Sequence, residues 1–233
     1  MRVHFERIED SRRKAQDVAK AATTFASEPL NVGIMCTIGP RRFSRFLDTF
    51  RNEHPAVAVT LHDATASVVP ELLLGGGLDC VFCVRAEKHD QRFEVVELFS
   101  EGVVVVFAQG HRFEAFEAVG LEEIAKEAYI DRLHCEFRDE FLAFTKSSGL
   151  ELDVAIRSER EDWILEFLHS GLGVSVMPAS SVIPETVAYR PIKGITASRK
   201  LELVMTVNAT VSPNLSAFRG AAKAFDWQQP IAN

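Results

Sequence analysis

The fold is decided by residues 30–84, which open with LNVGIMCTIGPRRFSRFLDTFRNEHP and continue through AVAVTLH to GGGLDCVFCV. The first six residues, LNVGIM, predict a short apolar strand. Pro40 is a favourable first-turn residue for a helix, and the apolar residues after it recur at i, i+3, i+4 and i+7, as on one face of a helix: Phe43, Phe46, Leu47, Phe50. We therefore expect a strand followed by a helix that ends at His54 and Pro55.

The pattern then repeats. AVAVTLH alternates like a strand, and residues 67–74 predict a short helix. LDCVFCV is nearly all apolar, as in strands inside parallel sheets. Alternating strands and helices indicate parallel pairing with right-handed crossovers. Residues 93–109 predict two strands separated at Ser100 to Gly102. A second alternation follows, with strands expected at 129–133, 152–157, 173–178 and 201–208 and helices at 137–147, 162–169 and 214–225.

Composition narrows the class of protein. The 233 residues are 47% hydrophobic, enough for a core, and carry a net charge of −7. Binding to nucleic acid needs clustered Lys and Arg, so these residues are not expected to contact DNA. No stretch approaches the roughly 18 apolar residues of a membrane span, and the N-terminus lacks the apolar part of a signal peptide. We expect a soluble, cytoplasmic protein.

The chain has four cysteines, at Cys36, Cys80, Cys83 and Cys135. Their number and spacing do not suit a secreted disulfide framework. Cys80 and Cys83 lie three apart on a predicted strand, so they point to opposite faces and cannot easily share a bond or a metal. Nucleophile elbows, phosphate-binding glycine loops and His-x-x-x-His metal spacing are also missing. We expect no catalysis, no cofactor and no metal.

Residues 30–84 resemble the first regulatory subdomain of LysR-type transcriptional regulators. The features that carry the resemblance are a strand containing Gly33, then Pro40, then FRNEHPAVAVTL, then the Gly-x-Leu-Asp type of turn at 76–79. LEFLHSGLGVSVMP, at residues 165–178, is similar to the second diagnostic stretch of the family.

The resemblance implies an α/β fold of the type 2 periplasmic-binding-protein kind, in which extended hinge strands join two Rossmann-like subdomains. We assign residues 1–28 to a linker helix, 29–99 with 207–233 to the first subdomain, and 100–206 to the second. It further implies a sensor that is not an enzyme, that forms a homodimer or tetramer, and that contacts no membrane. DNA would be bound only through an N-terminal winged helix-turn-helix that this sequence does not contain.

The expected ligand is a small-molecule effector, such as an organic anion, held between the lobes. Ligands of such folds bind at strand ends and helix N-termini, which makes the turn residues candidates: Thr37, Ile38, Thr65, Ser67, Val84, Arg85, Cys135, Phe137 and Ser158. Helix N-capping is an equal alternative for Thr65 and Ser67. A solvated surface charge is the alternative for Arg85 and Arg157.

Cys135 suggests a second function, since residues 134–139, His-Cys-Glu-Phe-Arg-Asp, resemble the peroxide-sensing segment of OxyR-type members of the family. The sequence departs from that pattern by one extra residue before Arg138 and by Thr145 near the position expected for a disulfide partner. A thiol-based oxidant sensor is therefore one alternative. A solute-binding receptor of a transporter is another, although the missing signal peptide and the linker-like first helix speak against it.

Overall fold

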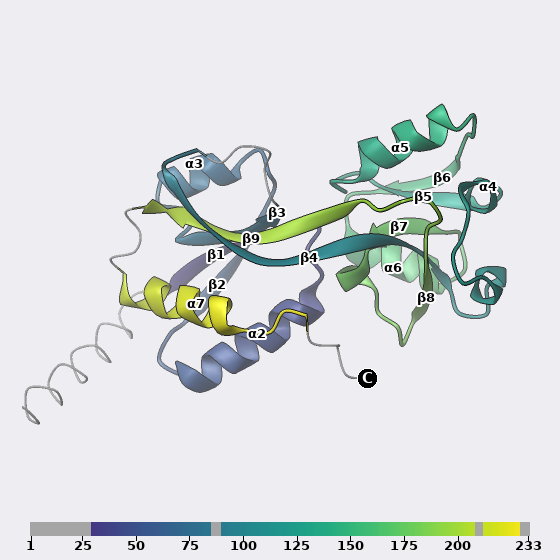
Figure 1. The fold of residues 1–233 in the computed structure, drawn as a ribbon. Helices are drawn as coiled ribbons and strands as arrows, with labels where there is room; N and C mark the ends of the chain where they lie inside the picture. The colour runs from purple at the N-terminus through teal and green to yellow at the C-terminus, as the bar shows by residue number, and fades with distance from the viewer. Residues whose placement is uncertain (1–28, 85–89, 208–211, 229–233) are drawn as a thin grey trace, which may run out of the picture.

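The computed structural model describes residues 29–84, 90–207 and 212–228, which form two lobes joined by long strands (Figure 1). The helix expected over 2–27 and the candidate Arg85 lie outside the described residues.

In the first lobe, the central strand β1 (Leu30–Met35) pairs in parallel with β2 (Val59–Ala64) on one side and β3 (Cys80–Val84) on the other. The parallel pairing predicted from the sequence is confirmed. On the far side of β3 the sheet continues with two antiparallel strands, β9 (Ser198–Thr206) and β4 (Phe93–Ala108).

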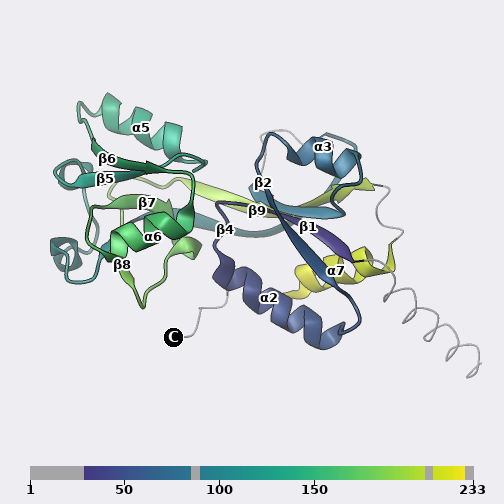
Figure 2. The same cartoon turned by 180° about the vertical axis from the view of Figure 1, so that it is seen from behind.

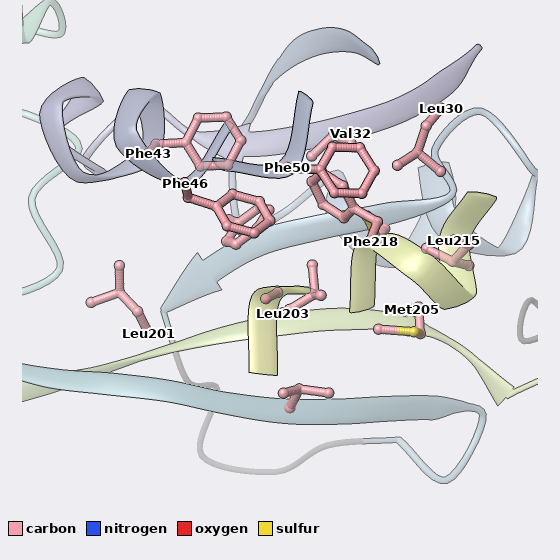
Figure 3. Packing of buried hydrophobic residues seen from close by; sticks show 14 of the residues in the cluster. Leu30, Val32, Phe43, Phe46, Phe50, Leu201, Leu203, Met205, Leu215 and Phe218 are labelled. Carbon is pink, nitrogen blue, oxygen red and sulfur yellow. The ribbon is translucent and has the colours of Figure 1, made fainter. Parts of the chain in front are cut away.

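Helices cover both faces of this sheet (Figures 1 and 2). On one face lie α2 (Pro40–Glu53) and α7 (Pro213–Ala224), while α3 (Val69–Leu74) lies on the other. The predicted phenylalanine stripe of α2 packs on the sheet and on α7 (Figure 3). Phe46 and Phe218 are 1% and 0% exposed, and their ring centroids are 5.1 Å apart.

Strand β4 runs through both lobes, and β9 pairs with it from the junction into the first lobe (Figure 1). The sequence predicted two strands over residues 93–109, and this was wrong: β4 is continuous, with only a shift in register against β9 between Glu97 and Phe99. Ser100, Glu101 and Gly102 look like a turn in the sequence, yet each is paired with a residue of β9. Antiparallel pairing therefore holds the strand extended between the lobes.

The chain re-enters the first lobe before residue 206, where we placed the end of the second subdomain. Residues 201–205 of β9 pair with β3, and Leu201, Leu203 and Met205 lie in the core of the first lobe. The two strands therefore pass between the lobes near residues 98–102 and 198–200.

In the second lobe, β4 pairs antiparallel with β7 (Ser175–Pro178) and β8 (Val187–Pro191). A parallel pair, β5 (Ala128–Arg132) and β6 (Asp153–Ser158), adjoins them through a bridge between Tyr129 and Val174. The remaining elements are η1 (Arg112–Ala115), α4 (Leu121–Ile124), α5 (Arg138–Ser147), α6 (Glu161–His169) and η2 (Ala179–Ser181). The predicted strand–helix alternation is confirmed here as well.

None of the helices in the described part of the chain is long and apolar enough to span a membrane.

Candidate functional site between the lobes

Arg199 lies at the point where β9 passes between the lobes, and its side chain is 1% exposed. Its Nε donates a hydrogen bond to Glu101 Oε1 at 2.8 Å, and Nη2 lies 2.7 Å from the same oxygen. Glu101 is opposite Arg199 in the register of β4 and β9. A buried charge is tolerated when it is paired and hydrogen-bonded, so this ion pair fixes the arginine at the junction.

The other side of the guanidinium reaches both lobes. Nη1 donates to Glu136 Oε2 at 3.0 Å and to Thr37 Oγ1 at 3.3 Å, and Nη2 donates to the Thr37 carbonyl at 2.9 Å. The Thr37 hydroxyl in turn donates to Glu136 Oε1. Thr37 follows β1 in the first lobe and Glu136 follows β5 in the second. We call Thr37, Glu101, Glu136 and Arg199 the junction cluster; it links the two lobes through polar bonds.

Two further contacts close the lobes beside this cluster. Gly39, which precedes α2, lies so close to η2 that a Cβ on it would be 2.6 Å from the carbonyl oxygen of Ser180. Only glycine permits this approach. The Ser180 backbone N–H donates to Glu101 Oε2 at 2.8 Å. Arg41 of α2 forms an ion pair of 2.6 Å with Glu185.

Charged side chains of the second lobe surround the β5–α5 turn. Arg132, 5% exposed, pairs with Glu161 at the start of α6. Asp131, 1% exposed, accepts two hydrogen bonds of 2.8 Å from Arg138. Burial raises the pKa of Glu161, and the Arg132 charge opposes this.

Cys135 lies in this turn and lines a cavity of about 10 Å³ together with Arg132, Arg138 and Phe137. A space of this size holds about one water-sized molecule. Burial raises the pKa of the Cys135 thiol, although the Arg132 charge and a backbone hydrogen bond act in the opposite direction.

The structure brings part of the predicted set to the junction. Thr37 is in the junction cluster, and Cys135 and Phe137 flank Glu136. Ile38 is half-buried and packs against the core on both faces of the first sheet. Ligand contact by these residues stays a prediction.

Other candidates make local contacts. The Thr65 and Ser67 hydroxyls bond each other at 3.0 Å. Neither caps α3, because its N-cap position is Val68 and no side chain caps it. Ser158 Oγ bonds the backbone of Arg160. Val84 donates its N–H to Met35 Sδ at 3.4 Å.

Sequence reasoning missed Arg199 and Glu101. Glu101 was placed in a turn, and Arg199 precedes an apolar strand where a solvated charge is unremarkable. Glu136 belongs to the segment 134–139 that the sequence singles out, together with Cys135 and Phe137.

Two other expectations concern cysteines and metals. Cys80 lies in the core beneath α2 and Cys83 in the core beneath α3, so the prediction that they point to opposite faces is confirmed. Both are free thiols. Within residues 29–84, 90–207 and 212–228, no three His, Cys, Asp or Glu side chains are grouped to hold a metal ion.

A larger cavity of about 200 Å³ lies within the second lobe. It is bounded by Phe137, Phe141 and Phe144 on one side and by residues 194–197 on the other, with Glu140 as its charged lining residue. It adjoins the β5–α5 turn through Phe137 and Phe141, which also line the small cavity at Cys135.

Two lobes bridged by β4 and β9, with polar turns meeting at the junction, form the architecture of a binding domain. Residues 25–226 match the LysR substrate binding domain family. The chain belongs to the LysR substrate-binding domain family. It is thus an effector-binding domain of the LysR type, and the resemblance found in the sequence is confirmed.

Curated relatives of this LysR domain include proteins named hydrogen peroxide-inducible genes activators. The DNA-binding transcriptional dual regulator OxyR of Escherichia coli (strain K12) is 27% identical over 161 residues, which cover 68% of this chain and 52% of that protein. The chain therefore spans about half the length of this curated relative.

Solved structures show the same fold. The reduced form of OxyR from N. meningitidis has a TM-score of 0.67 at 22% identity, covering 84% of this chain and 94% of the other. The effector-binding domain of QuiR in complex with shikimate has a TM-score of 0.68 at 18% identity, covering 84% and 95%.

Proposed function

We propose that this LysR domain is the sensing part of a DNA-binding transcriptional regulator and that it binds a small organic anion between its lobes. The observation that supports this most strongly is the buried guanidinium of Arg199 at the junction, surrounded by turns from both lobes. QuiR, which has the same fold, binds shikimate, a carboxylate. The role is binding and not catalysis.

The proposed signal is a change in how the lobes sit against each other. A ligand shifts such an equilibrium only by the difference in its affinity for the two arrangements. Thr37 and Glu136 belong to different lobes and bond each other, so an effector that changes these contacts would favour one arrangement over the other. Strands β4 and β9 would transmit the change.

We further propose that the regulator acts in the cytoplasm as a homodimer or tetramer, with a DNA-binding segment outside this chain. The family match supports regulation. Light scattering coupled to size-exclusion chromatography tests the assembly: a mass of two or four chains is expected, and a strictly monomeric mass of the full-length regulator would contradict it.

Thermal denaturation with a panel of carboxylates tests effector binding. Shikimate, benzoate and succinate are compared with benzamide, the neutral counterpart of benzoate. Binding to the native state alone stabilises by about 2.7 kcal/mol at a ligand concentration of 100 Kd. We expect at least one carboxylate to raise the Tm. An unchanged Tm with every carboxylate, or an equal rise with benzamide, would contradict an anion effector.

A second candidate function, oxidant sensing, is favoured by the position of Cys135 in a water-sized cavity beside Arg132 and Arg138. Thr145, near the position expected for a disulfide partner, is buried and bonds the Phe141 carbonyl at 2.8 Å.

Peptide mass spectrometry after mild peroxide treatment tests this second candidate. Oxidant sensing predicts sulfenic acid at Cys135, while Cys80 and Cys83 stay reduced. If Cys135 is no more oxidised than the core thiols, oxidant sensing is wrong.

A further inference from the structure

The guanidinium of Arg199 has no donor left over for a ligand. Its Nε is bonded to Glu101, its Nη1 to Glu136 and the Thr37 hydroxyl, and its Nη2 to Glu101 and the Thr37 carbonyl. Arginine recognises carboxylates through this planar set of N–H groups. A carboxylate that binds Arg199 must therefore replace one of the two glutamates.

Glu101 is held too firmly to be the one replaced. It lies on β4 directly opposite Arg199 in the pairing with β9. Its second oxygen accepts a hydrogen bond of 2.8 Å from the Ser180 backbone, and its side chain is 5% exposed. Moving this side chain would break its bonds to both Arg199 and the Ser180 backbone and leave a buried carboxylate without these partners.

Glu136 is held much less firmly. It lies in the turn between β5 and α5, and its side chain is 19% exposed. Its carboxylate accepts a hydrogen bond from Thr37 at one oxygen and from Arg199 at the other. Rotation of this side chain would release both partners to a ligand without altering a strand.

The charges of the junction cluster also indicate that a bound anion replaces Glu136. In the junction cluster Arg199 carries one positive charge and Glu101 and Glu136 carry two negative ones; the neighbouring Arg132 and Glu161 compensate each other. A further buried anion would add a second uncompensated negative charge, which is costly in a low-dielectric site. An anion that replaces Glu136 leaves the balance unchanged.

We propose that the carboxylate of Glu136 occupies, on Arg199 and Thr37, the place that an effector's carboxylate takes. The domain thus carries its own competing ligand, and an effector binds by displacing Glu136. Because Glu136 belongs to the second lobe and Thr37 to the first, displacement also breaks the bond between the lobes. This inference rests on the proposed function, and it assigns the effector a carboxylate or a similar planar anionic group.

Titration calorimetry on the full chain with shikimate, benzoate and succinate tests the inference. Glu136→Gln removes the competing charge and keeps the shape of the side chain. We expect it to tighten binding of the best carboxylate by roughly 5- to 150-fold, the usual range for coupling between binding events. Asp139→Asn removes a charge three residues away, at a side chain 93% exposed, and should leave the affinity unchanged.

Glu136→Ala serves as a second variant, and circular dichroism checks that each variant is folded. Equal or weaker binding by the Glu136 variants than by the wild type would overturn the proposal that Glu136 competes with the effector. The proposed binding of an anion between the lobes would then still stand. If neither the wild type nor any variant binds a carboxylate, both this inference and the anion effector are wrong. An equal gain in Asp139→Asn would show a general charge effect and would also overturn the inference.

Discussion

Glu101 and Arg199 face each other across the antiparallel pair β4 and β9, and their side chains form a 2.7 Å ion pair that is almost fully buried. The pair lies where both strands pass from one lobe to the other. It explains why a segment that looks like a turn in the sequence is an extended strand in the fold.

Arg199→Met should destabilise the domain strongly. Removing one partner of a buried ion pair leaves the other charge uncompensated, at a cost of about 3–5 kcal/mol in the free energy of unfolding. Urea denaturation measures it. Lys200→Met is the matched control: Lys200 is 44% exposed and pairs with Glu97 at 3.3 Å, so its loss should cost about 0–1 kcal/mol. Similar losses in both variants would contradict a structural role for the buried pair.

Gly39→Ala should weaken the contact between the lobes. The added methyl group would lie 2.6 Å from the Ser180 carbonyl oxygen, and overpacking of this kind costs about 1–3 kcal/mol. Gly220→Ala, on an exposed position of α7 with no neighbour within 4 Å of the new Cβ, should instead stabilise by about 0.5–1 kcal/mol. Thermal denaturation of both variants checks the opposite signs; a neutral Gly39→Ala would show that the approach is not tight.

The four thiols should react in two classes. Burial raises the pKa of all four thiols, that of Cys83 to about 12 and that of Cys80 well above its usual value, and Cys80 and Cys83 are also buried away from a reagent. Cys36 and Cys135 are partly exposed. Maleimide labelling followed by mass spectrometry should modify Cys36 and Cys135 in the native protein and all four cysteines in urea. Rapid native labelling of Cys83 would contradict its burial.

Lowering the pH should weaken the ion pairs that Glu123 forms with Lys126 and Arg112. Hydrogen bonds from Lys126 and Arg112 lower the pKa of Glu123 to about 2. A depressed carboxyl pKa contributes stability that is present above the unfolded value, 4.5, and is lost as the pH falls through the folded value. Glu123→Gln should therefore flatten the pH dependence of stability between about 4.5 and 2, which urea titrations across this range measure. An unchanged slope would contradict the pairing.

Local pattern was sufficient for most of the fold. The helical stripe of Phe43, Phe46 and Phe50 and the apolar strand ending at Val84 each reflect a repeat that a few residues define. The continuity of β4 could not be predicted, because Ser100 and Gly102 favour turns locally and only pairing with the distant β9 keeps them extended.

Residues of the site could be predicted from the sequence only where they lie in turns that follow predicted strands. Thr37, Cys135 and Phe137 follow strands, and the fold places them near the junction. Arg199 was missed because its role depends on Glu101, 98 positions away, and on Glu136 from another lobe. Contacts over such separations leave no periodic signal in a single sequence.

Hydrogen exchange measured by mass spectrometry, with and without saturating carboxylate, tests the central claim that an anionic effector binds between the lobes at Arg199. Shikimate, benzoate and succinate are the probes. Binding at the junction predicts altered protection in three separate segments, namely residues 36–39, 135–138 and 198–201. Changes confined to one lobe, or no change with any of the three carboxylates, would contradict it.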